Sequence, residues 1–536
     1  MGKFKFNPYR LLTILNLSLL IAVISILKVI VGAFSTPKNY AYLAVGHYWS
    51  DYFEYVQQVM QGMRGHWLVN NPFTANDPTR TFLGWEPYLL IGKFGSLFHW
   101  SPYFTYWFTV FFLTLIVCLL TYKLVTLLLP KESFLAQLGA WLLGLLATQF
   151  VNTRLVPYDY WYFPLSLFHR LGSAPHHLLS TIFIILIIIL LAKLFSDFHK
   201  FNLTKITCLT LSILFIMISL LSFAPFYVIS IMSGTLTLGF IDLIKKVELK
   251  LVYFLGLLVG IILPTALFFK YLHTGPLFQS TIAWETAQQS YPSLWELILY
   301  TGPVLIFIPF GIKSYFQEKT PLKILFFLFT LFSYLYFYTP LSLYLGSHNH
   351  RFLSPVSYTL FGVLAFLGMK AVTNRLPKNK IFPAGTVIIF LGYFVVITAI
   401  LYQTTFSTVD QLSYLPKDLI TGIKTLDSFP DKKAVLTSPA LSLGVIVPVI
   451  ADRNVYLGRL IFTPDFAKRT ALSDQFYLGQ LSDQQARNLM QENNIGYVIL
   501  GAIEKSHSSY NSRDLEKYSF LKKIFENNQV AIYKVI

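Results

Sequence analysis

Residues 11–34 read LLTILNLSLLIAVISILKVIVGAF, an apolar stretch with one charged side chain, Lys28. A helix that crosses the hydrocarbon core of a bilayer needs about 20 mainly apolar residues. The stretch follows the basic residues Lys3, Lys5 and Arg10, as a signal peptide would, but it is longer than the apolar part of such a peptide. We therefore predict that these residues form an uncleaved membrane anchor.

The rest of the chain repeats this pattern. The predicted spans are 11–34, 104–129, 134–151, 177–195, 205–222, 224–243, 250–270, 296–312, 322–339, 353–370 and 382–402. The composition agrees, since 55% of the residues are hydrophobic and 12% are charged, against roughly 25% charged in an ordinary globular domain. The sequence thus predicts a polytopic α-helical membrane protein with about 11 transmembrane helices. Residues 82–100 are expected to form a re-entrant or interfacial helix.

Basic residues lie mainly in alternate short loops, which predicts that these loops and the N-terminus are cytoplasmic. An odd number of spans then places the C-terminal segment outside the cytoplasm of a multi-pass protein of the cell membrane. The net charge of +17 also raises the question of nucleic acid. No basic and aromatic module of a nucleic-acid-binding kind is present, so we predict the lipid bilayer as a partner and no nucleic acid.

The apolar runs stop near Gln403, which predicts a membrane domain over 1–403 and an extracytoplasmic α/β domain over 404–536. Residues 404–410 are expected to form the linker. Strands are predicted at 433–437, 454–457, 496–500 and 529–533, and helices at 463–471 and 482–493. Ser482 and Gln485 have the spacing of a capping box. This alternation predicts a largely parallel sheet.

The loop after the first span carries Trp49-Ser-Asp51-Tyr-Phe-Glu54-Tyr55. Asp51 and Glu54 share one face if the segment is helical, and the aromatic side chains are typical of a helix in the headgroup region. Two interpretations stay open, a solvated interfacial helix and a pair of catalytic carboxylates. Glu86 is the third catalytic candidate and could line the cavity or begin the next helix.

The other acidic residues outside the spans carry less information. Asp77 precedes Pro78 and is typical of a turn, while Asp159 and Glu285 receive no role.

Arg351, within Asn349-His-Arg-Phe-Leu-Ser-Pro355, is the best candidate for binding a phosphate. Its planar guanidinium can pair with two phosphate oxygens, and His350 could donate a hydrogen bond. An interfacial arginine that reaches towards the headgroups is the alternative.

Arg154, His176 and His177 form a second basic group, with an ordinary loop or helix-start role as the alternative. Adjacent histidines lack the i,i+4 spacing of a helical metal pair, so no metal site is predicted. No cofactor is predicted either, and a divalent cation is left open.

In these motifs the chain resembles the GT-C superfamily of membrane glycosyltransferases, in the style of its bacterial family 39/83-like members. The motifs are Trp49-Ser-Asp51-Tyr, Asn71-Pro72 and Asn349-His-Arg351-Phe-Leu-Ser-Pro355. The resemblance implies a catalytic acid in the first loop, a polyprenyl-phosphate sugar donor, and a glycan, lipid or protein acceptor outside the cytoplasm. Tyr52 after Asp51 departs from the Asp-Glu pair of protein mannosyltransferase-like members, and the Trp-Trp-Asp motif of oligosaccharyltransferases is absent.

The predicted reaction is attack of an acceptor hydroxyl on the anomeric carbon, with the lipid phosphate leaving and the anomeric centre inverted. Asp51 would take the proton as general base, and Arg351 would stabilise the phosphate. A transporter or flippase of a lipid-linked envelope intermediate is the first alternative, and it predicts functional charges within the spans. A non-catalytic envelope assembly protein is the second. The charges cluster in the loops, which favours the transferase.

Overall fold

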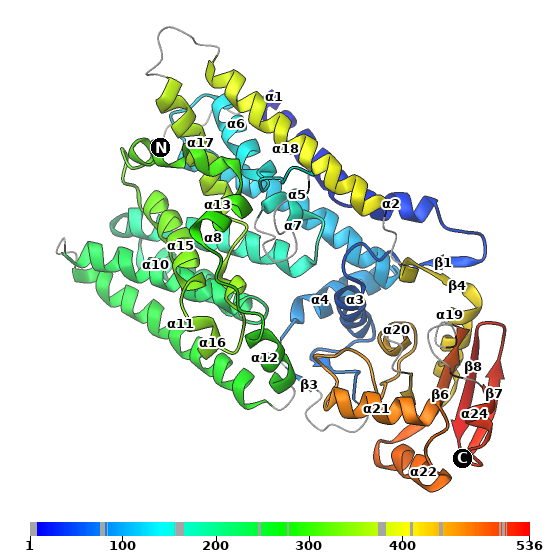
Figure 1. Cartoon of the computed structure of the whole chain (residues 1–536). Coiled ribbons are helices and arrows are strands. Elements are labelled where there is room, and N and C mark those ends of the chain that lie inside the picture. Colours follow the sequence, from blue (N-terminus) through cyan, green and yellow to red (C-terminus); the bar gives the residue numbers. More distant parts are fainter. Residues whose placement is uncertain are drawn as a thin grey trace. The chain divides into compact units, whose positions relative to one another are not determined.

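The computed structural model describes residues 8–74, 81–82, 84–154, 156, 166–244, 248–275, 278–373, 382–407, 411–438, 443–502, 505, 510 and 512–536. Most of these residues are helical (Figure 1). The chain forms two compact units. The helical unit comprises Met1–Leu27, Phe108–Tyr271 and Glu285–Thr408, and the mixed unit comprises Lys28–Trp107, Leu272–Trp284 and Val409–Ile536. These units differ from the domains 1–403 and 404–536, which were defined by membrane topology and stay a prediction.

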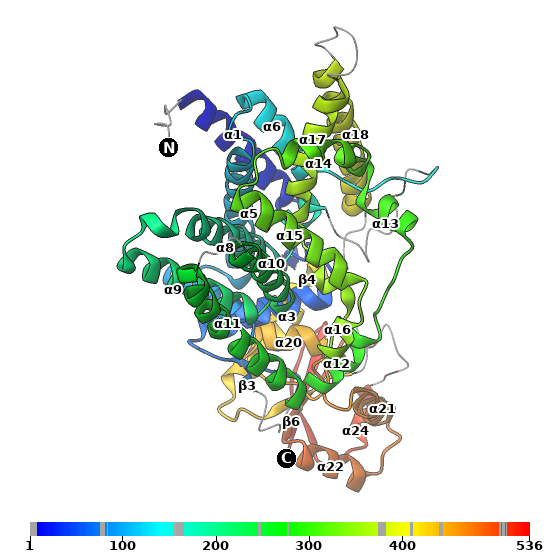
Figure 2. The ribbon, with the colours of Figure 1, turned by 90° about the vertical axis from the view of Figure 1, so that its left-hand side faces the viewer.

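The helical unit is built mainly from apolar helices. Its longer helices are α1 (Pro8–Ser25), most of α5 (Pro102–Leu128), α6 (Phe134–Leu146), α8 (Pro175–Asp197), α9 (Leu203–Leu221), α10 (Pro225–Ile244), most of α11 (Glu248–Thr274), α15 (Pro321–Phe337), α17 (Ser357–Thr373) and α18 (Phe382–Ser407). Its shorter helices are α7 (Leu167–Leu171), α13 (Leu294–Thr301), α14 (Ile308–Tyr315), α16 (Leu341–Tyr344) and the 3₁₀ turns η1 (Phe198–Lys200), η3 (Pro303–Phe307) and η4 (Asn349–Phe352). Figure 2 shows α8, α9 and α10 side by side.

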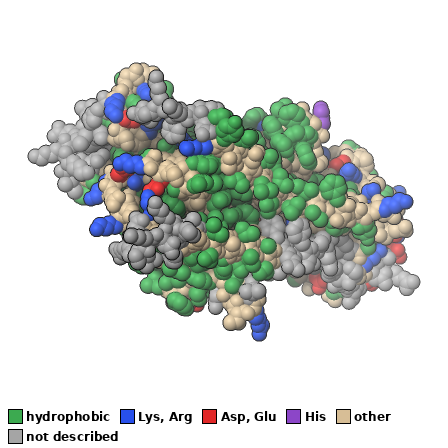
Figure 3. Space-filling view, turned by 90° about the horizontal axis from the view of Figure 1, so that it is seen from above, with side chains coloured by type: hydrophobic (Ala, Val, Ile, Leu, Met, Phe, Trp, Pro, Cys, Tyr) green, Lys and Arg blue, Asp and Glu red, His purple; other side chains and the backbone are tan. Residues whose placement is uncertain are grey.

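The length and composition of these helices are those of a multi-pass membrane protein. Within the described residues, α1, α5, α8 and α9 are the 4 helices long and apolar enough to cross a bilayer, and a bent pair makes up to 5. Further apolar helices are shorter than 18 residues. Hydrophobic side chains cover much of the face seen in Figure 3. The membrane-helical character is confirmed, while the count of about 11 spans stays a prediction.

Two predicted spans are interrupted. The stretch 11–34 divides near Ile26 into α1 and α2 (Leu27–Phe34). The stretch 296–312 is not one straight helix, because α13 and the following helical segment are bent by 107°. Gly302 lies at the bend with a φ of +96°, and a Cβ there would come within 2.0 Å of the Thr148 carbonyl oxygen. Only glycine fits this backbone conformation without strain.

In the mixed unit, helices α3 (Trp49–Met63) and α4 (Glu86–Leu97) pack with their backbones in contact. A Cβ on Gly62 would lie 2.1 Å from the Leu89 carbonyl oxygen, and one on Gly92 would lie 2.0 Å from that of Val59. Helix α4 falls within the predicted interfacial region 82–100. Its apolar side chains Leu90, Phe94 and Leu97 are exposed, together with Phe98 just after it.

The C-terminal part of the mixed unit holds a four-stranded sheet with the order β5-β6-β8-β7. The strands are β5 (Ala434–Leu436), β6 (Ile495–Gly501), β7 (Leu521–Glu526) and β8 (Val530–Val535). The helices are α19 (Lys417–Lys424), α20 (Leu443–Ile450), α21 (Phe466–Tyr477), α22 (Asp483–Glu492) and α24 (Ser512–Glu516), with the 3₁₀ turns η5 (Gln411–Ser413) and η6 (Thr425–Ser428). Two small antiparallel pairs join β1 (Tyr40–Tyr42) to β4 (Tyr414–Pro416), and β2 (Val69–Asn70) to β3 (Thr81–Phe82).

The structure corrects part of the predicted tail. Three of the predicted strands are confirmed, as is helix α22 with its capping box at Ser482. The largely parallel sheet was wrong, because only β5 and β6 are parallel whereas β8 runs antiparallel to both β6 and β7. Residues 454–457 supply one isolated bridge, from Val455 to Val435. The linker 404–410 was also wrong in part, since α18 continues to Ser407 and residues 408–410 lie outside the described residues.

We expect Gly92→Ala to destabilise the protein by about 1–3 kcal/mol, because its methyl group would overlap the Val59 backbone. Gly392→Ala on α18 is the matched control, since its Cβ meets nothing within 4 Å and alanine favours a helix. Thermal unfolding of the purified protein in detergent compares them. Equal melting temperatures for Gly92→Ala and wild type would show that the two helices can separate freely.

Candidate functional site

The predicted acidic pair, Asp51 and Glu54, lies on helix α3, so the i,i+3 spacing places both acids on one side of a helix. The helix begins at Trp49 and buries Tyr52, Phe53 and Val56. The two carboxylates differ in access, because the side chain of Asp51 is 36% exposed and that of Glu54 is 4% exposed. The helical interpretation is therefore confirmed, but Glu54 is a buried group and not one facing water.

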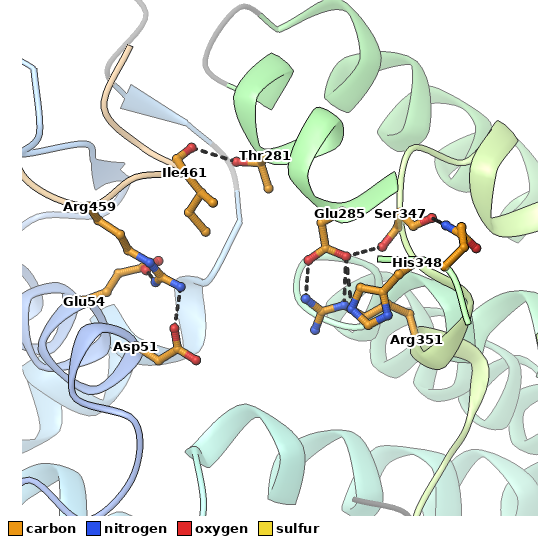
Figure 4. Close-up of polar contacts among 10 residues, drawn as sticks. Asp51, Glu54, Thr281, Glu285, Ser347, His348, Arg351, Arg459 and Ile461 are labelled. Carbon is orange, nitrogen blue, oxygen red and sulfur yellow. Dashed lines mark hydrogen bonds and ion pairs between the residues drawn. The ribbon is translucent and has the colours of Figure 1, made fainter. Parts of the chain in front are cut away.

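Both carboxylates bind Arg459, which the sequence analysis had not singled out (Figure 4). Its Nη2 donates a hydrogen bond to Asp51 Oδ1, and its Nη1 is ion-paired with Glu54 Oε2. The Arg459 side chain is only 14% exposed. Burial lowers the pKa of Arg459, and the negative charge of Asp51 opposes that shift. One guanidinium therefore bridges two acids that are a helical turn apart.

The segment that carries Arg459 is fixed by backbone hydrogen bonds. The Thr463 amide donates to the Arg459 carbonyl at 2.8 Å, which closes a tight turn. Asn71 Nδ2 donates to the Phe462 carbonyl at 2.8 Å, and Thr281 Oγ1 donates to that of Ile461 at 3.0 Å (Figure 4). All of these residues belong to the mixed unit, so Asn71 of the first loop, Thr281 of the segment 272–284 and the C-terminal segment itself hold this turn in place.

The third acidic candidate, Glu86, is the first residue of α4. Its Oε1 accepts a hydrogen bond of 2.5 Å from the Gly84 amide, and Trp85 between them has a left-handed backbone with φ +63°. This contact is that of an acid at the start of a helix. The catalytic role of Glu86 stays a prediction that this geometry does not favour.

Arg351 lies in the turn η4 of the helical unit and pairs with Glu285, an acid to which no role had been given (Figure 4). Arg351 Nε donates to Glu285 Oε2 at 3.3 Å, and Nη2 donates to Oε1. Ser347 Oγ donates to Oε2 at 2.6 Å, and His348 Nε2 lies 3.3 Å from the same oxygen. The carboxylate is thus surrounded by donors from one turn.

These contacts set the charges of the turn. Burial alone would raise the pKa of Glu285, but Arg351, His348 and the hydrogen bonds bring it down to about 2. Burial and the positive charge of Arg351 lower the pKa of His348 to about 3 and that of His350 to about 4. At neutral pH the histidines are therefore neutral, and Arg351 carries the positive charge.

Two of the three residues of the second basic group, His176 and His177, lie on α8 in the same unit. His177 Nε2 is 2.9 Å from Nη1 of Arg170, and His176 is buried with its ring centroid 4.0 Å from that of His177. The positive charge of Arg170 makes the smallest of the contributions that lower the pKa of His348.

The remaining sequence candidates are not part of these clusters. Arg154 is exposed in a turn where Asn152 Oδ1 accepts from its amide at 2.9 Å. Asp77 and Asp159 lie outside the described residues. In the part of the chain that the structure describes, no three His, Cys, Asp or Glu side chains are placed to hold a metal ion. The predictions on metal and cofactor stay predictions.

No protein-family model matches the sequence, and no curated protein matches it either. Solved structures do match. The archaeal oligosaccharyltransferase AglB from Archaeoglobus fulgidus, in complex with an inhibitory peptide and a dolichol-phosphate, superposes with a TM-score of 0.53 at 12% identity, covering 98% of this chain and 74% of that one. The apo oligosaccharyltransferase of the same organism gives 0.52 at 12% identity, covering 94% and 70%. ArnT from Cupriavidus metallidurans gives 0.49 at 9% identity, covering 98% of each chain.

The chain has the GT-C fold. The superposition on the archaeal enzyme extends over nearly the whole chain and includes both units. The predicted resemblance is therefore confirmed at the level of the fold.

We expect Glu285→Gln to lower the free energy of unfolding by about 1–2 kcal/mol, because an amide cannot balance the charge of a partly buried arginine. The pKa of Glu285 is lowered to about 2, so its contribution is complete above about pH 5 and is lost as the pH falls towards 2. Unfolding measured across this range should show the two proteins converging at low pH. The control is Glu526→Gln, whose exposed partner Lys523 lies at 3.1 Å, and little change is expected there. A constant difference at every pH would contradict the charge argument.

Proposed function

We propose that this protein is an integral-membrane glycosyltransferase that moves a sugar from a polyprenyl-phosphate-linked donor to an acceptor outside the cytoplasm. The observation that carries the proposal is Asp51, a half-exposed carboxylate on a helix directly after the first apolar segment, in a chain with the GT-C fold. The acceptor is a glycan, a lipid or a protein, and no cofactor is part of the proposal.

Asp51 is assigned as the general base. Its side chain is 36% exposed, whereas Glu54 is 4% exposed, so an acceptor hydroxyl can reach the first and not the second. A carboxylate that takes the hydroxyl proton during attack on the anomeric carbon would give inversion in a single displacement. Glu54 is therefore assigned to the ion pair with Arg459 beside Asp51 and not to taking the proton.

Arg351 is assigned to the phosphate of the donor. Its side chain is 40% exposed although its guanidinium is bound to Glu285, and arginine keeps its charge at any working pH. A cation beside the leaving phosphate stabilises the negative charge that develops there. The AglB structure with a dolichol-phosphate and a peptide supports a lipid-linked donor and an acceptor of this general kind.

The proposed topology follows the distribution of basic residues. About 11 spans, a cytoplasmic N-terminus and an extracytoplasmic segment 404–536 would place Asp51 and Arg459 outside the cytoplasm.

The neutral histidines of the Arg351 turn, His348 and His350, would bind the donor by hydrogen bonding and not by charge.

We expect Asp51→Asn to reduce turnover by at least about 100-fold, because an amide cannot accept the proton of the acceptor. Release of sugar from a polyprenyl-phosphate donor, with a panel of extracytoplasmic glycans, lipids and peptides as acceptors, is the measurement. Asp418→Asn, an exposed acid in the same unit, should keep wild-type turnover. Normal turnover by the folded Asp51→Asn protein would remove this residue from the mechanism.

We expect Arg351→Ala to weaken binding of a polyprenyl phosphate by about 10-fold or more, because a charge-assisted hydrogen bond contributes about 1.5–3 kcal/mol. Titration calorimetry on folded protein measures this affinity. Arg351→Lys keeps the positive charge but loses the planar guanidinium that can donate two parallel hydrogen bonds, so it should bind with intermediate affinity. Arg487→Ala on α22 serves as the control. Unchanged affinity in Arg351→Ala would assign the residue to holding Glu285 alone.

A further inference from the structure

We propose that Arg459 is a positioning residue for Asp51, supplied by the C-terminal segment to hold the base in place and to balance its negative charge together with that of the buried Glu54. The inference rests on the proposed role of Asp51 as general base. It adds a function for the turn between α20 and α21, which carries no motif of its own. Arg459 itself touches the two acids and is not assigned to the substrate.

The need for a cation follows from the positions of the two acids. Asp51 and Glu54 are one helical turn apart, and Glu54 is almost fully buried. Two carboxylates that share a site cannot both ionise easily, and burial adds to the cost of the charged form. A guanidinium bound to both removes this conflict, because its two Nη atoms each meet one carboxylate. A lysine ammonium is a point charge and cannot pair with both in this way.

The other titratable groups around α3 do not supply this charge. His47 is buried and its pKa is lowered to about 4 by burial, against the opposing effect of Asp51, so it is neutral at pH 7. Tyr106 on α5 is hydrogen-bonded to His47 at 2.7 Å, and a phenol cannot supply a positive charge.

The charged residues on the packed elements are engaged elsewhere. On α4, Lys93 donates to the Gly65 carbonyl at 3.0 Å, and Glu86 accepts from Gly84. Arg64, just beyond α3, pairs with Asp452 at 3.1 Å. Helix α20, which packs on α3, has no charged residue. Among the described residues, Arg459 is the basic side chain within ion-pair distance of Asp51 and Glu54.

The acid limb of the pH–rate profile tests the inference. Loss of an opposite charge at this distance raises the pKa of a carboxylate by about 1–3 units, so Arg459→Gln should move the limb upward by at least about one pH unit. Glu54→Gln removes the competing acid, so among these variants its rate should fall at the lowest pH. The double variant Glu54→Gln with Arg459→Gln should return it near the wild-type position, and Arg459→Lys should lie between wild type and Arg459→Gln.

A second measurement needs no substrate. In Arg459→Gln the pKa of buried Glu54 rises above its unfolded value, so the melting temperature of this variant should fall as the pH rises from 5 to 8. The double variant has no buried carboxylate at position 54 and should lose this pH dependence. If Arg459→Gln does not fold, Glu54→Gln and the double variant carry the test, because removing Arg459 must still raise the acid limb between them.

The outcomes separate the two proposals. Full turnover by Asp51→Asn would overturn the proposed base, whatever Arg459 does. Suppose instead that Asp51→Asn is inactive, and that the rate falls at the same acidic pH in wild type, in Glu54→Gln and in the double variant. This result would overturn the role of Arg459 and leave Asp51 as the base. A lower rate in Arg459→Gln with an unshifted acid limb and a melting temperature that does not depend on pH would also overturn it.

Discussion

A carboxylate buried on a packed helix is stabilised by a cation held against it, because burial disfavours the charged form. Glu54 is 4% exposed, and both Glu54 and Asp51, one helical turn before it, pair with Arg459. The helix itself cannot provide the cation, because its sequence WSDYFEYVQQVMQGM contains no lysine or arginine. The charge therefore comes from a residue some 400 positions away in the chain, and the local fold around α3 has to bring the C-terminal segment to it.

The same balance governs the helical unit. Glu285 is buried, and its charge is matched by Arg351 with support from Ser347 and His348. The sequence interpretation made Arg351 the ligand of the phosphate and gave His350 a hydrogen bond to it. Because the pKa of His350 is lowered to about 4, the two residues differ in kind at neutral pH. The arginine attracts an anion through its charge, whereas a neutral imidazole adds only a hydrogen bond.

Much of the fold could be predicted because apolar runs of span length are read directly from the sequence. The helices α5, α8, α9 and α10 begin and end within two residues of the predicted spans. The bend at Gly302 was not predictable, since it depends on the Thr148 backbone, which is distant in the sequence. The strand β7 was also missed, because its sequence LKKIFE carries three charges and resembles a solvent-exposed segment.

The members of the candidate site could be named from the sequence only where they share one segment or one motif. Spacing along one segment identified Asp51 and Glu54, and a motif identified Arg351. Their partners Arg459 and Glu285 come from other segments and lie in no recognisable pattern. Glu285 had one available signal, an acid within a loop otherwise rich in aromatic residues. Arg459 had a weaker one, a basic residue after Gly458 in an apolar stretch of the tail. Neither signal names a partner, because ion pairs between distant segments depend on tertiary structure.

The contacts of the tail also bear on what residues 404–536 are for. A freely acting binding module would be joined to the rest of the chain by a linker and would fold by itself. Here β4 pairs with β1 of the first loop, and Asn71 binds the Phe462 carbonyl. The compact unit accordingly combines residues of both segments. A boundary set by where the apolar runs stop therefore divides the chain by its relation to the membrane, while folding joins the tail to the loop that carries Asp51. A tail tied to that loop through Arg459 is better suited to holding Asp51 in place than to acting independently as a scaffold.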